Sequence, residues 1–146
     1  MSKWEQRDLV RLRGVHADLQ FAVLAILEAM EALGFPMMVV EGLRTTERQL
    51  ALYAQGRSTP GPIVTRVDGV KTIGTHQVQA DHFGHAVDCA FVDDPGTKQD
   101  ETYDLTMPWD LYGLMAGKLG LVWGGTWKTM RGDLGHVELA PPKATA

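Results

Sequence analysis

The segment HAVDCAFV, residues 85–92, places one acidic side chain inside an otherwise apolar stretch. Its β-branched and aromatic residues predict a strand that is buried in the core of the protein. Asp88 lies in the middle of this stretch, and a carboxylate in apolar surroundings is costly unless it is paired or binds a cation. The residues leave two interpretations open, a structural salt bridge with an arginine or a metal ligand. Either one requires a positive charge beside a core strand.

Most of the histidines are concentrated near this strand. His16 lies in a predicted helix among surface residues, and we expect it to face solvent rather than bind a metal. The other four occur between residues 76 and 88 or at residue 136, and they are His76, His82, His85 and His136. Asp133 lies three residues before His136, and Glu138 alternates with His136 along a predicted strand. Two histidines and one carboxylate with an open fourth position are typical of a hydrolytic zinc site, where a further carboxylate can take a proton from water.

Local patterns predict a mixture of helices and short strands. Apolar residues at helical spacing run from about residue 8 to residue 33, where Gly14 can divide the helix and Gly34 can end it. Thr45 or Thr46 can cap a helix over 47–55. The other predicted elements are a helix over 108–119 and strands over 35–41, 63–67, 70–73 and 85–92. This order predicts an α+β fold, a single domain with a small, mostly antiparallel sheet and helices packed on it.

The length of 146 residues suits one domain with one hydrophobic core. We predict that this domain covers residues 1–140, with a helical part at 1–34, and that residues 141–146 form a disordered tail. A net charge of −4 argues against binding nucleic acid by broad phosphate neutralisation, which requires a basic face. The N-terminal residues lack the apolar region of a secretory signal, and the longest apolar run, 21–27, is too short to cross a bilayer. We therefore expect synthesis in the cytoplasm and no stable membrane association.

Four short stretches carry a family resemblance, and they are GHAVD at 84–88, DLGH at 133–136, GLRT at 42–45 and WGGTW at 123–127. The first two resemble the SxHxxGxAxD and DxxH motifs of the zinc D-Ala-D-Ala carboxypeptidase and L-alanyl-D-glutamate endopeptidase family, peptidase family M15. The other two resemble an arginine turn and a WGGxW segment of phage endolysins in that family. Its fold is shared with Hedgehog signalling domains. The resemblance extends from about Phe35 to Leu139.

The resemblance implies a Zn²⁺ site formed by His76, Asp88 and His136. It also implies that Asp133 is the general base and that Arg44 stabilises an oxyanion or binds a substrate carboxylate. Without the resemblance, the residues favour a surface role for Arg44 in the N-terminal turn of a helix, and they are compatible with a turn role for Asp133. They also leave open whether the tryptophans of the WGGTW stretch line a substrate groove or pack at the edge of the sheet.

The first metal ligand is a choice between two histidines. The family motif places this ligand seven residues before Asp88, where the chain has Asp81, whereas His82 lies six residues before it and His76 twelve. We prefer His76, because its THQ context is similar to the SxHQ form of many endolysins. A five-residue insertion in a surface loop also costs little. His82, with a one-residue deletion, is the alternative. Strand alternation predicts that His85 points away from Asp88.

The resemblance implies a metallopeptidase that cuts peptidoglycan stem peptides. Within the family, the endolysin-like stretches favour an L-alanyl-D-glutamate endopeptidase of a phage or prophage. Such an enzyme is expected to be a monomer that reaches the periplasm through a holin-made opening, for lysis or for infection. Two alternatives stay open, a D-Ala-D-Ala carboxypeptidase and a non-catalytic, Hedgehog-like metal-binding module.

Overall fold

The computed structural model describes residues 5–92, 104–127 and 133–141. Within these residues, four strands form one antiparallel sheet in the order β1-β2-β4-β3. The strands are β1 (Met37–Glu41), β2 (Ala86–Phe91), β3 (Leu121–Trp123) and β4 (His136–Leu139), and the α-helices are α1 (Glu5–Arg11), α2 (Ala17–Ala32), α3 (Thr46–Ala54) and α4 (Trp109–Lys118). The predicted α+β fold with an antiparallel sheet is confirmed. The tail predicted over 141–146 lies outside the described residues, apart from residue 141.

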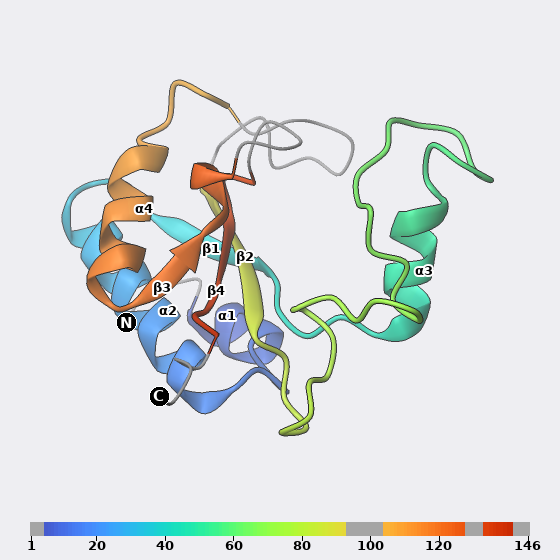
Figure 1. The fold of residues 1–146 in the computed structure, drawn as a ribbon. Helices are drawn as coiled ribbons and strands as arrows, with labels where there is room; N and C mark the ends of the chain where they lie inside the picture. Colours follow the sequence, from blue (N-terminus) through green and yellow to red (C-terminus); the bar gives the residue numbers. More distant parts are fainter. Residues whose placement is uncertain (1–4, 93–103, 128–132, 142–146) are drawn as a thin grey trace, which may run out of the picture.

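One face of the sheet packs against the apolar core, and the other face carries polar side chains. Helices α2 and α4 lie on one side of the sheet, and α3 with the loops that follow it lies on the other side (Figure 1). Along β2, Val87, Cys89 and Phe91 are fully buried in the apolar core. Asp88 lies between them in the sequence and therefore points to the opposite face, because successive strand side chains alternate. That opposite face carries the polar site.

The core ties the helices to the strand that carries His136. The apolar stripe of α2 and the buried Tyr112 of α4 belong to the same core cluster; the α2 residues are Leu19, Val23, Ile26, Leu27 and Met30. The Tyr112 hydroxyl donates a hydrogen bond to the carbonyl oxygen of Gly135 at 2.9 Å, so α4 holds the turn that precedes β4. No helix in the described parts of the chain is both long and apolar enough to span a membrane.

Gly14 divides the N-terminal helical region, as its position predicted. Its φ of +80° is a left-handed conformation, and a Cβ atom at this position would lie 2.6 Å from a methyl carbon of Leu43. His16 then caps α2, because its Nδ1 atom accepts a hydrogen bond from the backbone N–H of Asp18 at 3.1 Å. His16 is therefore half-buried at the start of the helix rather than solvent-facing within it.

The strands predicted over 63–67 and 70–73 are wrong, and both segments are irregular loop. Side chains provide the hydrogen bonds that a hairpin partner would otherwise make. The Asp68 carboxylate accepts three consecutive backbone N–H groups, those of Val70, Lys71 and Thr72. The buried amide of Gln49, which belongs to α3, donates to the carbonyl oxygen of Val67 at 2.8 Å. Local β propensity cannot reveal such competition.

Candidate metal centre

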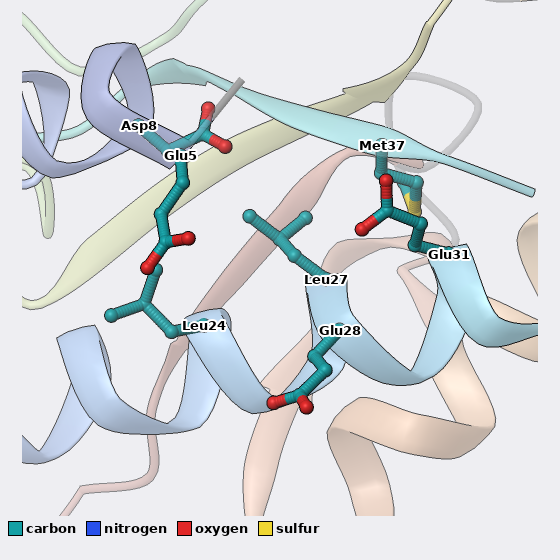
Figure 2. Close-up of a pocket in the computed structure, with 7 residues that line it drawn as sticks. All are labelled: Glu5, Asp8, Leu24, Leu27, Glu28, Glu31 and Met37. Atoms are coloured by element: carbon teal, nitrogen blue, oxygen red, sulfur yellow. The ribbon is translucent and has the colours of Figure 1, made fainter. Parts of the chain in front are cut away.

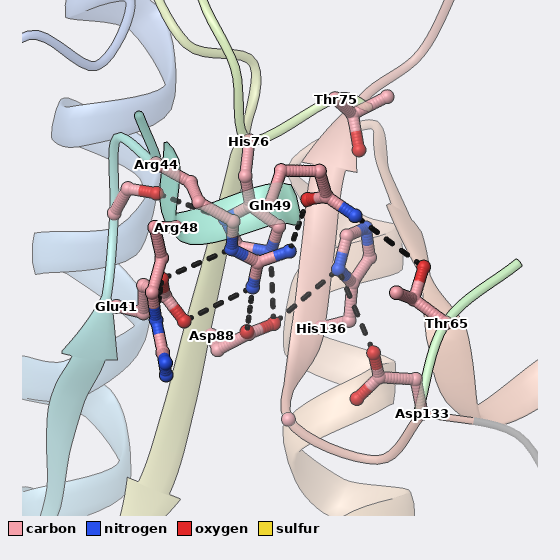
Figure 3. A network of polar contacts seen from close by, with 12 residues as sticks. Glu41, Arg44, Arg48, Gln49, Thr65, Thr75, His76, Asp88, Asp133 and His136 are labelled. Atoms are coloured by element: carbon pink, nitrogen blue, oxygen red, sulfur yellow. Dashed lines mark hydrogen bonds and ion pairs between the residues drawn. The ribbon is translucent and has the colours of Figure 1, made fainter. Parts of the chain in front are cut away.

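Asp88 and His136 face each other from neighbouring strands. The register of β2 and β4 places Asp88 directly opposite His136, so both side chains leave the same face of the sheet. The Nδ1 atom of His136 lies 3.3 Å from Oδ1 of Asp88, and the two side chains are 6% and 14% exposed. Figure 3 shows both side chains within the polar network beside α3.

His76 reaches the same carboxylate oxygen from the loop before β2. Its Nε2 atom lies 3.2 Å from Oδ1 of Asp88, and its ring centroid is 5.1 Å from that of His136. On the other side of the ring, Nδ1 lies 2.9 Å from the carbonyl oxygen of Gly42 and donates a hydrogen bond to it in the neutral tautomer. This contact leaves the Nε2 lone pair directed at Asp88, in the orientation that a metal ligand needs.

The cluster contains two buried polar atoms that make no hydrogen bond to any described residue, Nε2 of His76 and Oδ1 of Asp88. Buried polar atoms are almost always satisfied, so a facing pair of unsatisfied atoms requires an explanation. A cation bound by both atoms is such an explanation. Together with His136 they offer two nitrogens and one oxygen within 4.8 Å of one another, and this donor set suits zinc. We refer to His76, Asp88 and His136 as the candidate metal centre.

Glu138 holds His136 in the orientation that this centre requires. Its Oε1 atom lies 2.8 Å from Nε2 of His136. Because this contact engages Nε2, the other ring nitrogen, Nδ1, faces Asp88. The Thr75 hydroxyl lies 3.5 Å from the same carboxylate oxygen. A carboxylate behind a ligating histidine fixes its ring and raises its basicity. The only signal for Glu138 in the sequence is its alternation with His136.

The charges of the cluster favour an ionised carboxylate at its centre. Burial opposes ionisation of Asp88, but the charges of His76 and His136, which both lie within 3.3 Å of its Oδ1 atom, outweigh burial and hold the pKa of Asp88 well below its usual value. Burial would lower the pKa of His136, yet the nearby carboxylates of Asp88 and Glu138 raise that pKa to about 9 in the metal-free protein. Asp88 is thus available as an anionic ligand throughout the neutral range.

Asp133 lies next to the centre and is partly open to solvent. Its Oδ2 atom is 3.8 Å from Nδ1 of His136, and its side chain is 44% exposed. Partial burial and the negative charge of Asp88 raise the pKa of Asp133 to about 6. A carboxyl group with a pKa close to neutrality can both accept and release a proton under ordinary conditions.

The other histidines lie outside the centre. His82 is exposed and has a φ of +74°. His85 bonds through Nε2 to Oδ2 of Asp81 at 2.7 Å, and the same oxygen lies 3.9 Å from Nε2 of His16. The structure therefore brings His76, and not His82, to the other two members of the candidate metal centre.

The two tryptophans of the WGGTW stretch have different surroundings. A Cβ atom added to Gly113 or Gly125 would lie 2.2 Å from the Trp123 indole, so Trp123 is packed tightly between glycines. Trp127 is 39% exposed, and its ring centroid lies 4.9 Å from that of His136. Trp123 thus packs at the sheet, whereas Trp127 borders the candidate metal centre.

Arg44 also lies beside the centre, with Nη2 at 3.6 Å from Oδ2 of Asp88. Its other side-chain partners are Glu41 and Gln49. Sequence patterns gave no signal for Glu41, because its position opposite Asp88 depends on the exact register of two strands.

A separate hollow lies between α1, α2 and β1 (Figure 2). It is lined by Glu5, Asp8, Leu24, Leu27, Glu28, Glu31 and Met37. One of its four carboxylates already has a structural partner, since Oδ1 of Asp8 accepts the backbone N–H of Val39 at 2.9 Å. Among the described residues, none of these carboxylates belongs to a group with metal-binding spacing.

Comparison with known proteins places this geometry in context. Residues 74–139 match the family model described as D-alanyl-D-alanine carboxypeptidase, and this span contains the candidate metal centre and Asp133. The chain is 28% identical over 148 residues to the peptidoglycan L-alanyl-D-glutamate endopeptidase CwlK of Bacillus subtilis (strain 168), covering 95% of this chain and 84% of that protein.

Solved structures share the fold. The L-Ala D-Glu endopeptidase ChiX of Serratia marcescens superposes with a TM-score of 0.52 at 26% identity, covering 92% of this chain and 86% of that chain. The LD-carboxypeptidase LdcB gives a TM-score of 0.59 at 20% identity, covering 88% of this chain and 67% of that chain. The second similarity concerns the fold alone.

Proposed function

We propose that this chain, which carries a peptidase M15 domain, is a zinc-dependent endopeptidase that cleaves peptidoglycan stem peptides between L-Ala and D-Glu. The observation that carries this proposal is the buried, unsatisfied pair of His76 Nε2 and Asp88 Oδ1. These atoms converge with Nδ1 of His136, next to the partly exposed carboxylate of Asp133. Zinc is the metal on which M15 peptidases depend.

The candidate metal centre would hold zinc through Nε2 of His76, a carboxylate oxygen of Asp88 and Nδ1 of His136. Bound there, zinc supplies a Lewis acid that polarises the scissile carbonyl and makes water more acidic. The protein itself contributes the orientation of the ligands. The Gly42 carbonyl fixes the ring of His76, and Glu138 fixes that of His136.

Asp133 is the proposed general base. It would accept a proton from the water that attacks the L-Ala carbonyl, and then donate that proton to the amine of D-Glu as the peptide bond breaks. Its raised pKa, about 6, suits both steps near neutral pH. Trp127 borders the same opening and offers an apolar wall to the substrate.

The choice of bond is supported by the relatives. CwlK and ChiX are both named as endopeptidases of the L-Ala–D-Glu bond, and each matches most of this chain. We further propose that the protein is a phage or prophage endolysin, a monomer that reaches the periplasm by holin-type release and binds neither nucleic acid nor membrane stably. The endolysin-like WGGTW stretch at 123–127 supports this role.

The second candidate is a D-Ala-D-Ala carboxypeptidase, which the description of the matching family favours. Mass spectrometry of the products from purified sacculi separates the two reactions. The endopeptidase releases peptides that begin with D-Glu and leaves L-Ala on the glycan. Free D-Ala with intact L-Ala–D-Glu bonds would establish the carboxypeptidase instead.

A third candidate is a non-catalytic module that binds metal without hydrolysis. The variant Asp133→Ala distinguishes it from an enzyme, because the substitution removes the proposed base and leaves the three metal ligands in place. We expect zinc to be retained and the rate of peptide release to fall by about 100-fold or more. An unchanged rate would contradict the role of Asp133, and no release by the wild-type protein would indicate the module.

A further inference from the structure

A β-bulge places a second carboxylate opposite the central metal ligand. Val39 pairs with Cys89, but the next pair is Glu41 with Asp88, so Val40 is an extra residue in β1. In uninterrupted antiparallel pairing, Val40 would lie opposite Asp88, and Glu41 would point to the other face of the sheet. Bulges commonly redirect a side chain next to a functional site. Here the bulge brings Glu41 to the face that carries Asp88.

Two like charges directly opposite each other destabilise a sheet unless a cation joins them. Arg44 provides this cation, as Figure 3 shows. Its Nε and Nη2 atoms donate to the two carboxylate oxygens of Glu41, both at 3.0 Å, and Nη2 lies 3.6 Å from Oδ2 of Asp88. Burial would raise the pKa of Glu41, but the hydrogen bonds and charge of Arg44 outweigh burial and lower it.

Arg44 is itself held by other parts of the chain. Its backbone N–H donates to the carbonyl oxygen of His76 at 2.8 Å, and the next residue, Thr45, caps α3. Its Nη1 donates at 2.9 Å to the side-chain oxygen of Gln49, which is 1% exposed. Glu41 and Gln49 therefore hold the guanidinium group of Arg44 in place beside Asp88.

The contact of Arg44 is with the Asp88 oxygen that does not face the histidines. Oδ2 lies beside Arg44, whereas Oδ1 lies within 3.3 Å of both His76 and His136. A carboxylate held at one oxygen presents the other oxygen in a fixed direction. The ion pair with Arg44 therefore favours the orientation of Asp88 in which Oδ1 faces both histidines.

We propose that Glu41 and Arg44 are positioning residues that fix Asp88 for metal binding. This inference rests on the proposed function, since it assumes that Asp88 is a metal ligand. Both residues lie outside the span that matches the family model, which begins at residue 74. The pair is thus defined by the register of β1 and by the loop that leads to α3.

The test compares metal binding in Glu41→Gln, Arg44→Lys, the double variant and a matched control. Arg48→Gln is that control. The Nε atom of Arg48 lies 3.5 Å from Oε1 of Glu41, the oxygen that also accepts from Nε of Arg44. The Arg48 side chain is 56% exposed, however, and no contact joins it to Asp88. Zinc affinity is measured by chelator competition, and the visible spectrum of the Co²⁺-loaded protein reports ligand geometry. We expect each single variant to bind zinc about 10- to 100-fold more weakly, with a shifted cobalt spectrum. The double variant should bind zinc no more weakly than the single variant with the lower zinc affinity. Arg48→Gln should have the zinc affinity and the cobalt spectrum of the wild type.

Three results would overturn the proposal. Unchanged zinc affinity and cobalt spectra in Glu41→Gln and Arg44→Lys would show that Asp88 needs no positioning, while the proposed function would stand. Loss of turnover in Arg44→Lys at unchanged affinity and spectrum, with Glu41→Gln fully active, would place Arg44 on the substrate. Wild-type protein that binds no zinc would instead remove the proposed function, and the role of the pair with it. If Arg44→Lys fails to fold, the zinc affinities and cobalt spectra of Glu41→Gln and the control Arg48→Gln test the proposal without it.

Discussion

At the scale of single residues, the two ring nitrogens of His136 have different tasks. Nε2 is bonded to Glu138, and Nδ1 faces the carboxylate of Asp88. His76 is arranged in the same way, with Nδ1 bonded to the Gly42 carbonyl and Nε2 left for the centre. Each histidine is thus oriented by a contact on the side away from the candidate metal centre, and those contacts determine how well the centre is formed before metal arrives.

Removal of the contact behind His136 should therefore weaken metal binding. Glu138→Ala is expected to reduce zinc affinity by about 10- to 100-fold, because the ring loses the group that fixes its tautomer and direction. Glu138→Gln retains an acceptor oxygen and should have a smaller effect. Chelator competition measures both, and equal affinity of wild type and Glu138→Ala would contradict the role of Glu138.

Cys89 lies next to Asp88 but belongs to the apolar face of β2. It is fully buried, and burial raises the pKa of its thiol to about 12, so it carries almost no thiolate at pH 8. We expect no reaction with a disulfide reagent in the native protein and complete reaction after denaturation in guanidinium. Rapid, stoichiometric labelling of the native protein would show that this face of the strand is open.

At the scale of elements, the irregularity in β1 matters as much as its regular part. The bulge at Val40 brings Glu41 opposite Asp88, and the Arg44 turn that follows connects β1 to α3. The apolar and β-branched residues of 35–41 predicted the strand. A one-residue change in register, however, depends on the partner strand and cannot be predicted from local propensity. The same limit explains the two false strands before residue 74, where Asp68 and Gln49 capture the backbone.

The pair of Glu41 and Arg44 predicts a pH dependence of stability. Arg44 outweighs burial and lowers the pKa of Glu41 in the folded state. A lowered carboxyl pKa contributes stability above the unfolded value of about 4.3, and this contribution is lost as the pH falls through the folded value. The metal-free Glu41→Gln variant should therefore unfold at lower urea concentration than the wild type at pH 7, and the difference should shrink toward pH 3. Glu47→Gln, an exposed position in the first turn of α3, is the control. A difference that does not vary with pH would contradict the assignment.

At the scale of the whole molecule, the candidate metal centre joins segments that are far apart in the sequence. His76 comes from a loop, Asp88 from β2 and His136 from β4. Metal binding should therefore stabilise the entire fold. The free energy of unfolding should rise by about 4 kcal/mol when the free zinc concentration is 1,000 times the Kd. Thermal unfolding with and without a chelator measures this effect. Asp133→Ala should retain it, because Asp133 is not a ligand, and a melting temperature insensitive to zinc would contradict a centre of this kind.

Much of this arrangement could be predicted from local sequence. The core strand around Asp88, the division at Gly14 and the helix capped by Thr45 follow from short patterns, and the structure contains them. The contacts that orient the ligands could not be predicted in this way. Glu138 was visible only as an alternating residue, and Glu41 only through strand register, because both contacts arise when separate segments pack together.

The central claim is that His76, and not His82, completes the centre with Asp88 and His136. Zinc content measured by elemental analysis of the purified wild type, His76→Ala and His82→Ala tests it directly. We expect one zinc ion per chain in the wild type and in His82→Ala, whose exposed side chain lies outside the centre, and little zinc in His76→Ala. Retention of zinc by His76→Ala together with its loss from His82→Ala would contradict the account.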